Sequence, residues 1–198
     1  VKVNQITIKK SVNQFVDRAT ITLPISARIS LDGKLNDETK IVARSFSEGA
    51  KVKIRLGYNG QLQDEFIGFI SRVNFKSPLE VECEGYSYQL RKRTYKKVFK
   101  NTKLVEILKF LAQGTDIIVT ESNVASVEVT KLLLQDHSGT EALQLIKKMF
   151  NELLLIWFDG NVLHARVFPV EPIGPTVKYR VGANVINADD LKKREAVN

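Results

Sequence analysis

The chain has little of several residue types on which binding and catalytic sites commonly depend. Its 198 residues include one cysteine, Cys83, and two histidines, His137 and His164. A single cysteine excludes an internal disulfide and indicates folding in a reducing cytoplasm. Neither histidine lies near Cys83 in the sequence, so no metal-ligand spacing is present, and both are interpreted as structural or solvated. We therefore expect no metal ion and no cofactor.

Motifs for nucleotide binding and nucleophilic catalysis are also missing. No G-x-S-x-G, P-loop or G-x-G-x-x-G pattern occurs, and no apolar run reaches the roughly 18 residues that span a bilayer. Glu80, Glu82 and Glu84 alternate along one predicted strand and imitate paired catalytic carboxylates, but an exposed acidic strand face is the commoner arrangement. Cys83 has the opposite parity and is interpreted as a buried apolar residue. We expect no catalysis and no contact with a membrane.

The N-terminal part has the two-residue alternation of β-strands. Apolar residues at even spacing predict a strand over 15–25, and the weaker strand 1–9 is expected to pair with it. Residues 26–48 are polar and are interpreted as an inserted loop, with a helical turn over 38–44.

A hairpin and a third strand follow this loop. Residues 52–58 alternate and are followed by Asn59-Gly60, the strongest short signal for a type I′ hairpin. On the return strand the apolar parity changes, which predicts a bulge between Glu65 and Gly68. The strand 79–84 follows, and its alternation is expected to continue through 86–90.

Residues 102–168 are predicted to form a compact α+β unit. Thr102 or Asn101 can cap a helix whose apolar residues from Leu104 to Leu111 follow the helical period, and Gly114 suits its end. Short strands are expected over 117–120 and 127–134. The capping box Ser138-Gly-Thr-Glu141 then opens a second helix. Its apolar face is expected to carry Ala142, Leu143, Ile146, Met149, Phe150 and Leu153. A hairpin over 154–168 turns at Asp159-Gly160.

The C-terminal part begins with a connector. Residues 169–175 hold three of the five prolines and predict a stiff, extended segment, after which 176–181 has a strand pattern. The polar residues 187–198 have no partner pattern of their own, and we expect that a further C-terminal domain is missing from this sequence.

A basic cluster follows the third strand and contributes much of the net charge of +8. It is the candidate contact for a partner or polyanion, and its residues are Arg91, Lys92, Arg93, Tyr95, Lys96, Lys97, Phe99 and Lys100. Aromatic rings interleaved with cations suit single-stranded nucleic acid. Lysines on an exposed strand also prevent edge-to-edge aggregation, and a cationic surface suits an acidic partner subunit. All three interpretations remain open, with DNA the less favoured partner.

The chain resembles the late-control protein D family of phage tails, which includes Mu-like tail proteins and related baseplate hubs. The resemblance covers nearly the whole chain and rests on the order and spacing of segments that are each degenerate. They are R-A-T-I-T-L-P at 18–24, G-A-K-V-K-I-R-L-G-Y-N-G at 49–60, F-I-G-F-I-S-R-V at 66–73, P-L-E-V-E-C-E-G at 78–85, Y-Q-L-R-K at 88–92, N-T-K-L-V-E-I-L-K-F-L-A at 101–112, E-A-L-Q-L-I at 141–146 and F-D-G-N-V-L-H-A at 158–165. Two features depart from the family pattern: the loop 26–48 matches no family segment, and the second barrel of a full hub is absent.

This resemblance implies a fold, a function and partners. The fold would be α+β, with a mainly antiparallel β-barrel domain of the tail-tube or hub type, split over 1–101 and 171–198, and an inserted α+β domain over 102–170. The function would be that of a virion structural protein of a phage, a prophage or a contractile injection system, made in the bacterial cytoplasm and placed in the tail baseplate. As a homotrimer, it would form a ring that adapts the tail tube protein to the spike protein, without catalysis. The alternative is a nucleic-acid-binding module that uses residues 91–103.

Overall fold

The computed structural model describes residues 3–24, 46–76 and 78–168. The expected helical turn over 38–44, the proline-rich connector, the strand over 176–181 and the returning part of the split domain lie outside these residues. No helix among the described residues is long and apolar enough to cross a membrane.

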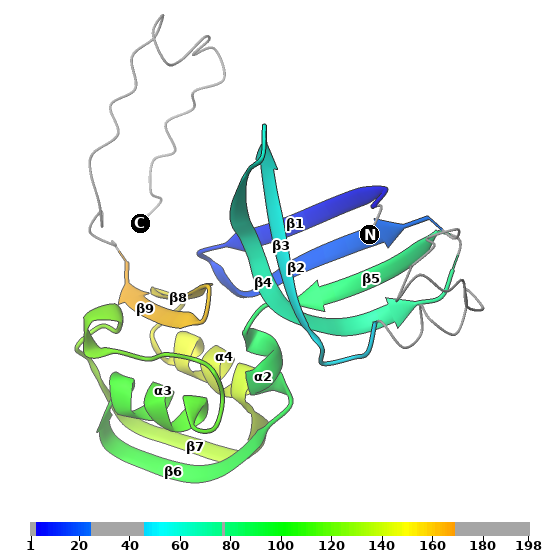
Figure 1. Cartoon of the computed structure of the whole chain (residues 1–198). Helices are drawn as coiled ribbons and strands as arrows, with labels where there is room; N and C mark the ends of the chain where they lie inside the picture. Colours follow the sequence, from blue (N-terminus) through cyan, green and yellow to red (C-terminus); the bar gives the residue numbers. More distant parts are fainter. Residues whose placement is uncertain (1–2, 25–45, 77, 169–198) are drawn as a thin grey trace, which may run out of the picture. The chain divides into compact units, whose positions relative to one another are not determined.

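A five-stranded antiparallel sheet forms the N-terminal part. Its strands are β1 (Gln5–Ser11), β2 (Gln14–Leu23), β3 (Lys51–Tyr58), β4 (Gln61–Asn74) and β5 (Leu79–Glu84), in the spatial order β1-β2-β5-β4-β3. The strands curl as in part of a barrel wall (Figure 1). β1 pairs only with β2 and β3 pairs only with β4, so within the described residues each end of the sheet is an edge.

The predicted β3–β4 hairpin and its bulge are confirmed. Asn59 and Gly60 both have positive φ, 52° and 81°, as a type I′ turn requires. Ile54 pairs with Phe66, but the next residue, Arg55, pairs with Asp64. Glu65 is therefore the extra residue of a bulge, at the N-terminal end of the predicted interval.

One face of the sheet carries its own apolar core. The buried members are Ala19, Leu23, Ile54, Phe66, Ile70, Leu79, Val81 and Cys83. They come from β2, β3, β4 and β5, because alternate residues of each strand point to the same face. The predicted burial of Cys83 is confirmed, with 2% of the residue exposed.

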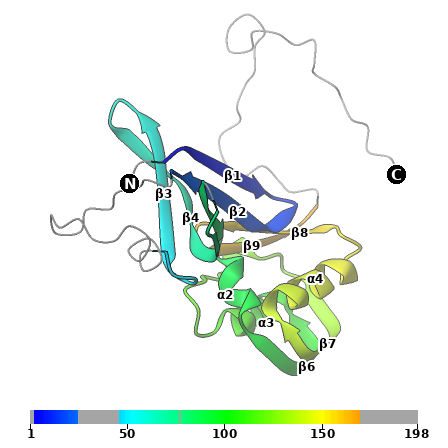
Figure 2. The same ribbon diagram turned by 90° about the vertical axis from the view of Figure 1, so that its right-hand side faces the viewer.

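The described second half contains three helices and two antiparallel strand pairs. Its elements are α2 (Ser87–Arg91), β6 (Thr94–Lys103), α3 (Leu104–Ala112), a 3₁₀ turn (Glu121–Asn123), β7 (Glu128–Ser138), α4 (Gly139–Met149), β8 (Leu154–Asp159) and β9 (Val162–Val167). The strands β6 and β7 pair antiparallel, and so do β8 and β9. Figure 2 shows α3 and α4 near the strand pair β6–β7, and the apolar faces of both helices belong to one core with β6 to β9. Together the two halves form a β-rich α+β fold, as expected from the sequence.

The capping box of the second helix is confirmed. The hydroxyl of Ser138 accepts a hydrogen bond from the amide of Glu141, and the carboxylate of Glu141 accepts one from the amide of Ser138. The expected apolar face is wrong at Met149 and Leu153, whereas Phe150 packs against the core. Met149 and Leu153 are exposed, because the helix ends at Met149 and the left-handed residues Asn151 and Glu152 turn the chain away.

Three further expectations need correction. Residues 86–90 do not continue a strand, because 87–91 form the short helix α2, in which Ser87, Tyr88 and Leu90 are all buried. Residues 117–120 form no strand, only a single bridge from Ile118 to β9. The helix α3 begins at Leu104 without a side-chain cap, because the hydroxyl of Thr102 donates to the carbonyl of Lys100.

Candidate interaction surface

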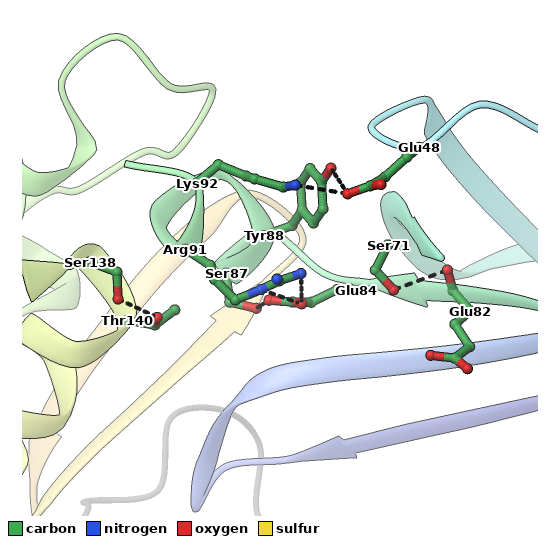
Figure 3. A network of polar contacts seen from close by, with 10 residues as sticks. All are labelled: Glu48, Ser71, Glu82, Glu84, Ser87, Tyr88, Arg91, Lys92, Ser138 and Thr140. Atoms are coloured by element: carbon green, nitrogen blue, oxygen red, sulfur yellow. Dashed lines mark hydrogen bonds and ion pairs between the residues drawn. The ribbon is translucent and has the colours of Figure 1, made fainter. Parts of the chain in front are cut away.

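The basic cluster begins at the end of α2, where two of its cations bind glutamates of the same chain. The guanidinium of Arg91 donates from Nε and Nη2 to Oε2 of Glu84, at 3.0 and 2.8 Å (Figure 3). Nζ of Lys92 lies 2.7 Å from Oε1 of Glu48, and this hydrogen bond holds the pKa of Glu48 below its usual value. Both cations also lie 5.3 Å from the centre of the Tyr88 ring. These contacts engage Arg91 and Lys92 with acids of the same chain, although both side chains remain about half exposed.

The glutamates of β5 do not form the exposed acidic face that alternation predicts. Glu84 is buried, with 8% of the residue exposed, and its second oxygen accepts a hydrogen bond from Ser87 at 2.9 Å. Glu80 and Glu82 are half-buried and share the side-chain amide of Asn74. The prediction failed because β5 lies in the centre of the sheet, between β2 and β4.

Arg93 binds the end of α3. Its guanidinium donates to the backbone carbonyls of Gln113 and Gly114, which follow the last helical residue. A helix C-terminus carries partial negative charge and unpaired carbonyls, so a cation is stabilising there. Arg93 is therefore a capping residue in this structure.

The two aromatic residues of the cluster point into the core. Phe99 is buried, and its ring meets that of Phe110 edge-on at 5.4 Å. Tyr95 is half-buried, and its hydroxyl donates to the carbonyl of Leu111 at 2.6 Å. Burial raises the pKa of Tyr95. Neither ring offers a free face on which a nucleic-acid base could stack.

The remaining lysines of the cluster are more available. Nζ of Lys97 lies 4.1 Å from the centre of the Phe110 ring. Lys96 and Lys100 are exposed, and neither has an ion pair or side-chain hydrogen bond with the described part of the chain. Lys100 stands directly opposite Lys131 of β7, a like-charge pair that weakens the pairing of these two strands. The structure thus separates a cluster that is continuous in sequence into cations with partners in the same chain and cations without one among the described residues.

A second exposed surface was not identified from the sequence. The end of the β3–β4 hairpin extends beyond the other strands of its sheet (Figures 1 and 2). It exposes Leu56, Leu62 and above all Tyr58, which is 90% exposed. The length of this hairpin could have indicated the surface. The apolar alternation continues to Tyr58, although in the described structure the strands β3 and β4 near the turn pair only with each other.

A broad trough of about 920 Å³ runs over strands of the five-stranded sheet. Its lining is mixed, with threonines of β1 and β2, the cations Arg18 and Arg72, and the acids Glu80 and Glu82. Cys83 borders it, but burial raises the pKa of this thiol to about 11, so it is protonated near neutral pH and a poor nucleophile. The described residues contain no group of three histidines, cysteines or carboxylates placed to hold a metal ion.

The most strongly perturbed carboxyl group is that of Asp17 in β2. Burial raises its pKa to about 6, and the nearby Lys10 only partly offsets this effect. The backbone carbonyl of Asp17 accepts a hydrogen bond from the amide of Gly85 at 2.9 Å. A Cβ at Gly85 would lie 3.1 Å from Cβ of Asp17, so the chain passes closely beside this side chain. In the part of the chain that the structure describes, no histidine, thiol or second acid forms a hydrogen bond with Asp17 that would complete a catalytic arrangement.

No protein-family model matches the chain, and no curated protein sequence matches it. Among solved structures, the chain is similar to the 43 kDa tail protein of prophage MuSo2 from Shewanella oneidensis, with a TM-score of 0.53 and 15% sequence identity. The match covers 80% of this chain and 49% of the tail protein, so the chain spans about half the length of that protein. At this level of identity, the comparison establishes a shared fold with a prophage tail protein.

Proposed function

We propose that the chain is a structural component of a phage or prophage tail, and that it forms part of a ring-shaped baseplate hub between tail tube and spike. In this proposal the full-length protein is a homotrimer, acts without catalysis and resides in the virion tail. The observation that carries the proposal is the likeness of the fold to a prophage tail protein over 80% of this chain.

The free edges of the five-stranded sheet support an assembly role. Within the described residues, β1 and β3 each pair on one side only. An unpaired edge presents backbone donors and acceptors that a strand of another chain can satisfy. A curled sheet with two such edges can continue into a neighbouring copy, which is the geometry that a ring requires.

The projecting β3–β4 hairpin supplies apolar contact area beside one of these edges. Tyr58 and Leu62 lie on either side of its turn and are exposed in the single chain. Tyrosine combines a large apolar ring with a polar end and is frequent at the centres of protein interfaces. We therefore assign this hairpin to a contact between subunits.

Sedimentation velocity on the full-length protein tests the proposal. We expect the average mass to rise with concentration toward that of a trimer, and to rise further when the tail tube protein is added. The double variant Tyr58→Ser with Leu62→Ser should weaken self-association by about thirtyfold, because it removes two apolar contacts worth about 1 kcal/mol each. Val12→Ser is the matched control, since Val12 and Leu62 are each 54% exposed.

Two results would contradict the proposal. One is a strict monomer at every concentration that joins neither tube nor spike protein. The other is an equal effect of the hairpin variant and the Val12 control, which would show that the hairpin is not part of the interface. The role in the tail would then be tested only by mixing the protein with the tail tube protein.

The nucleic-acid alternative loses its main argument in this geometry, because Tyr95 and Phe99 are directed into the core. Cations alone can still bind phosphates without sequence preference. Oligonucleotide binding near physiological salt that is abolished by Lys96→Glu with Lys97→Glu would restore this alternative.

A further inference from the structure

A groove lies between β6 and α3, in the second half of the chain. Its volume is about 570 Å³. The described residues that line it come from β6, from α3 and from the position after α3: Lys97, Val98, Phe99, Lys100, Thr102, Glu106, Lys109, Phe110 and Gln113. No described residue of β7 contributes, so the groove follows the side of β6 that faces away from its partner strand.

The helix presents one continuous stripe to this groove. Glu106, Lys109, Phe110 and Gln113 are spaced by three and four residues, which places them on one side of α3. The strand presents its unpaired edge, since the described structure pairs β6 with β7 alone. A strand edge beside a helix is the geometry in which an extended peptide adds to a sheet and places alternate side chains against the helix.

The charges in the groove favour an anionic occupant. Lys97, Lys100 and Lys109 line the groove together with a single acid, Glu106. Lys97 is held above the Phe110 ring at 4.1 Å, so its ammonium has a defined position over an apolar surface. Lys109 has only a distant partner, Glu121 at 4.0 Å, and both of these side chains are at least half exposed.

We propose that this groove binds an extended, acidic segment of a partner protein, which adds as a strand to the free edge of β6. The backbone of the segment pairs with β6, and its carboxylates meet Lys97, Lys100 and Lys109. The site goes beyond the tail role proposed above and does not depend on it, because it uses neither the five-stranded sheet nor the β3–β4 hairpin.

A protein segment fits this groove better than a nucleic acid does. The ammonium of Lys97 covers the face of Phe110, so no aromatic face is open for a base. Glu106 would repel a phosphate backbone, whereas a peptide can place an apolar or polar side chain there.

The test uses the intact chain and a fluorescein-labelled heptapeptide of alternating glutamate and valine, measured by fluorescence anisotropy. A second peptide carries N-methyl groups on alternate residues, which keep its charge but remove the backbone donors needed for strand pairing. A short oligothymidylate of similar charge is the third probe. Amide hydrogen exchange over residues 97–102 reports where the peptide binds.

We expect the alternating peptide to bind and to slow exchange in β6. Lys100→Glu and Lys109→Glu should each weaken binding by at least about threefold, because each reverses a charge that faces the ligand. Lys96→Glu is the matched control. It makes the same charge change on the same strand, but Lys96 does not line the groove, and its effect should stay below about twofold.

Several outcomes would overturn the inference. Equal binding of the N-methylated peptide would show attraction by charge without strand addition. An equal loss in the Lys96 control would move the contact away from the groove. Tighter binding of the oligothymidylate would assign the surface to nucleic acid, and absence of peptide binding up to about 1 mM would remove the site.

Discussion

Replacing Arg91 with methionine tests whether this cation organises the interior or serves an external contact. The carboxylate of Glu84 is 8% exposed and accepts from Ser87 and from two nitrogens of Arg91. Removing one partner of a fully buried ion pair costs about 3 to 5 kcal/mol. The side chain of Arg91 is 44% exposed, so water can replace part of the guanidinium. We expect a loss of about 2 kcal/mol in the free energy of unfolding.

The assay is urea unfolding followed by circular dichroism, with a thermal scan beside it. A loss of this size should lower the Tm by about 4 to 8 °C in a chain of this length. A double-mutant cycle with Glu84→Gln isolates the pair from other effects of the substitution. We expect a coupling free energy of about 1 to 2 kcal/mol, because a neutral amide at position 84 no longer needs the cation.

Lys96→Met is the control for this experiment, since Lys96 is an exposed neighbour in the same basic cluster. It should change the free energy of unfolding by less than about 0.5 kcal/mol. The reasoning is refuted if Arg91→Met is as harmless as this control. It is also refuted if its cost is the same with glutamate and with glutamine at position 84.

Three further predictions concern close packing and pH. Gly139→Ala should cost about 1 to 2 kcal/mol in urea unfolding, because its Cβ would lie 2.8 Å from Cβ of Leu90. Gly57→Ala should speed amide exchange at the hairpin end, because a Cβ there would lie 1.7 Å from the carbonyl oxygen of Gln61. Asp17, whose pKa is raised from 3.8 to about 6, holds its proton in the folded state at pH values where the unfolded chain has lost it. Stability should therefore fall as the pH rises from about 4 to 6, and Asp17→Asn should remove this fall and add about 1 kcal/mol at pH 7.

The controls for these predictions use nearby exposed positions. Gln144→Ala lies on the same helix as Gly139 and should be nearly neutral, and Gln63→Ala serves the same purpose for Gly57. Unchanged exchange in the Gly57 variant, or an unchanged urea midpoint in the Gly139 variant, would contradict the close approaches. For Asp17, the contradicting result is a pH profile that keeps its slope between pH 4 and 6 in the asparagine variant.

The features that could be predicted from the sequence depend on neighbouring residues. The turn at Asn59-Gly60 needs two residues with positive φ, and the capping box at Ser138 needs a glutamate three positions later. The bulge at Glu65 is visible in the sequence as a change in the parity of the apolar positions within one strand. Each signal lies within a few residues, so the chain reveals it without knowledge of the fold.

The binding partners of the charged residues could not be predicted in this way. Lys92 binds Glu48, which is 44 positions away, and Arg93 binds carbonyls 20 and 21 positions away. Charge alone does not distinguish a cation that binds a distant acid from one that remains free. The basic cluster therefore looked uniform in sequence, although Lys92 and Arg93 bind groups of the same chain and Lys96 has no such partner among the described residues.

The position of β5 between β2 and β4 has a consequence for folding kinetics. The β1–β2 and β3–β4 hairpins can each form from contacts between residues close in sequence. Strand β5 pairs with both hairpins: its Glu84 lies opposite Arg18 of β2 and opposite Phe69 of β4. The chain between Arg18 and Glu84 must be closed into a loop, at a cost in entropy, before the hydrogen bonds between β2 and β5 can form. Docking of β5 is therefore expected to limit the folding rate. Until β5 docks, β2 and β4 each expose an inner edge. These edges are present in addition to the outer edges at β1 and β3. The nascent chain is then open to strand exchange with a second copy, and the yield of refolding should fall with protein concentration.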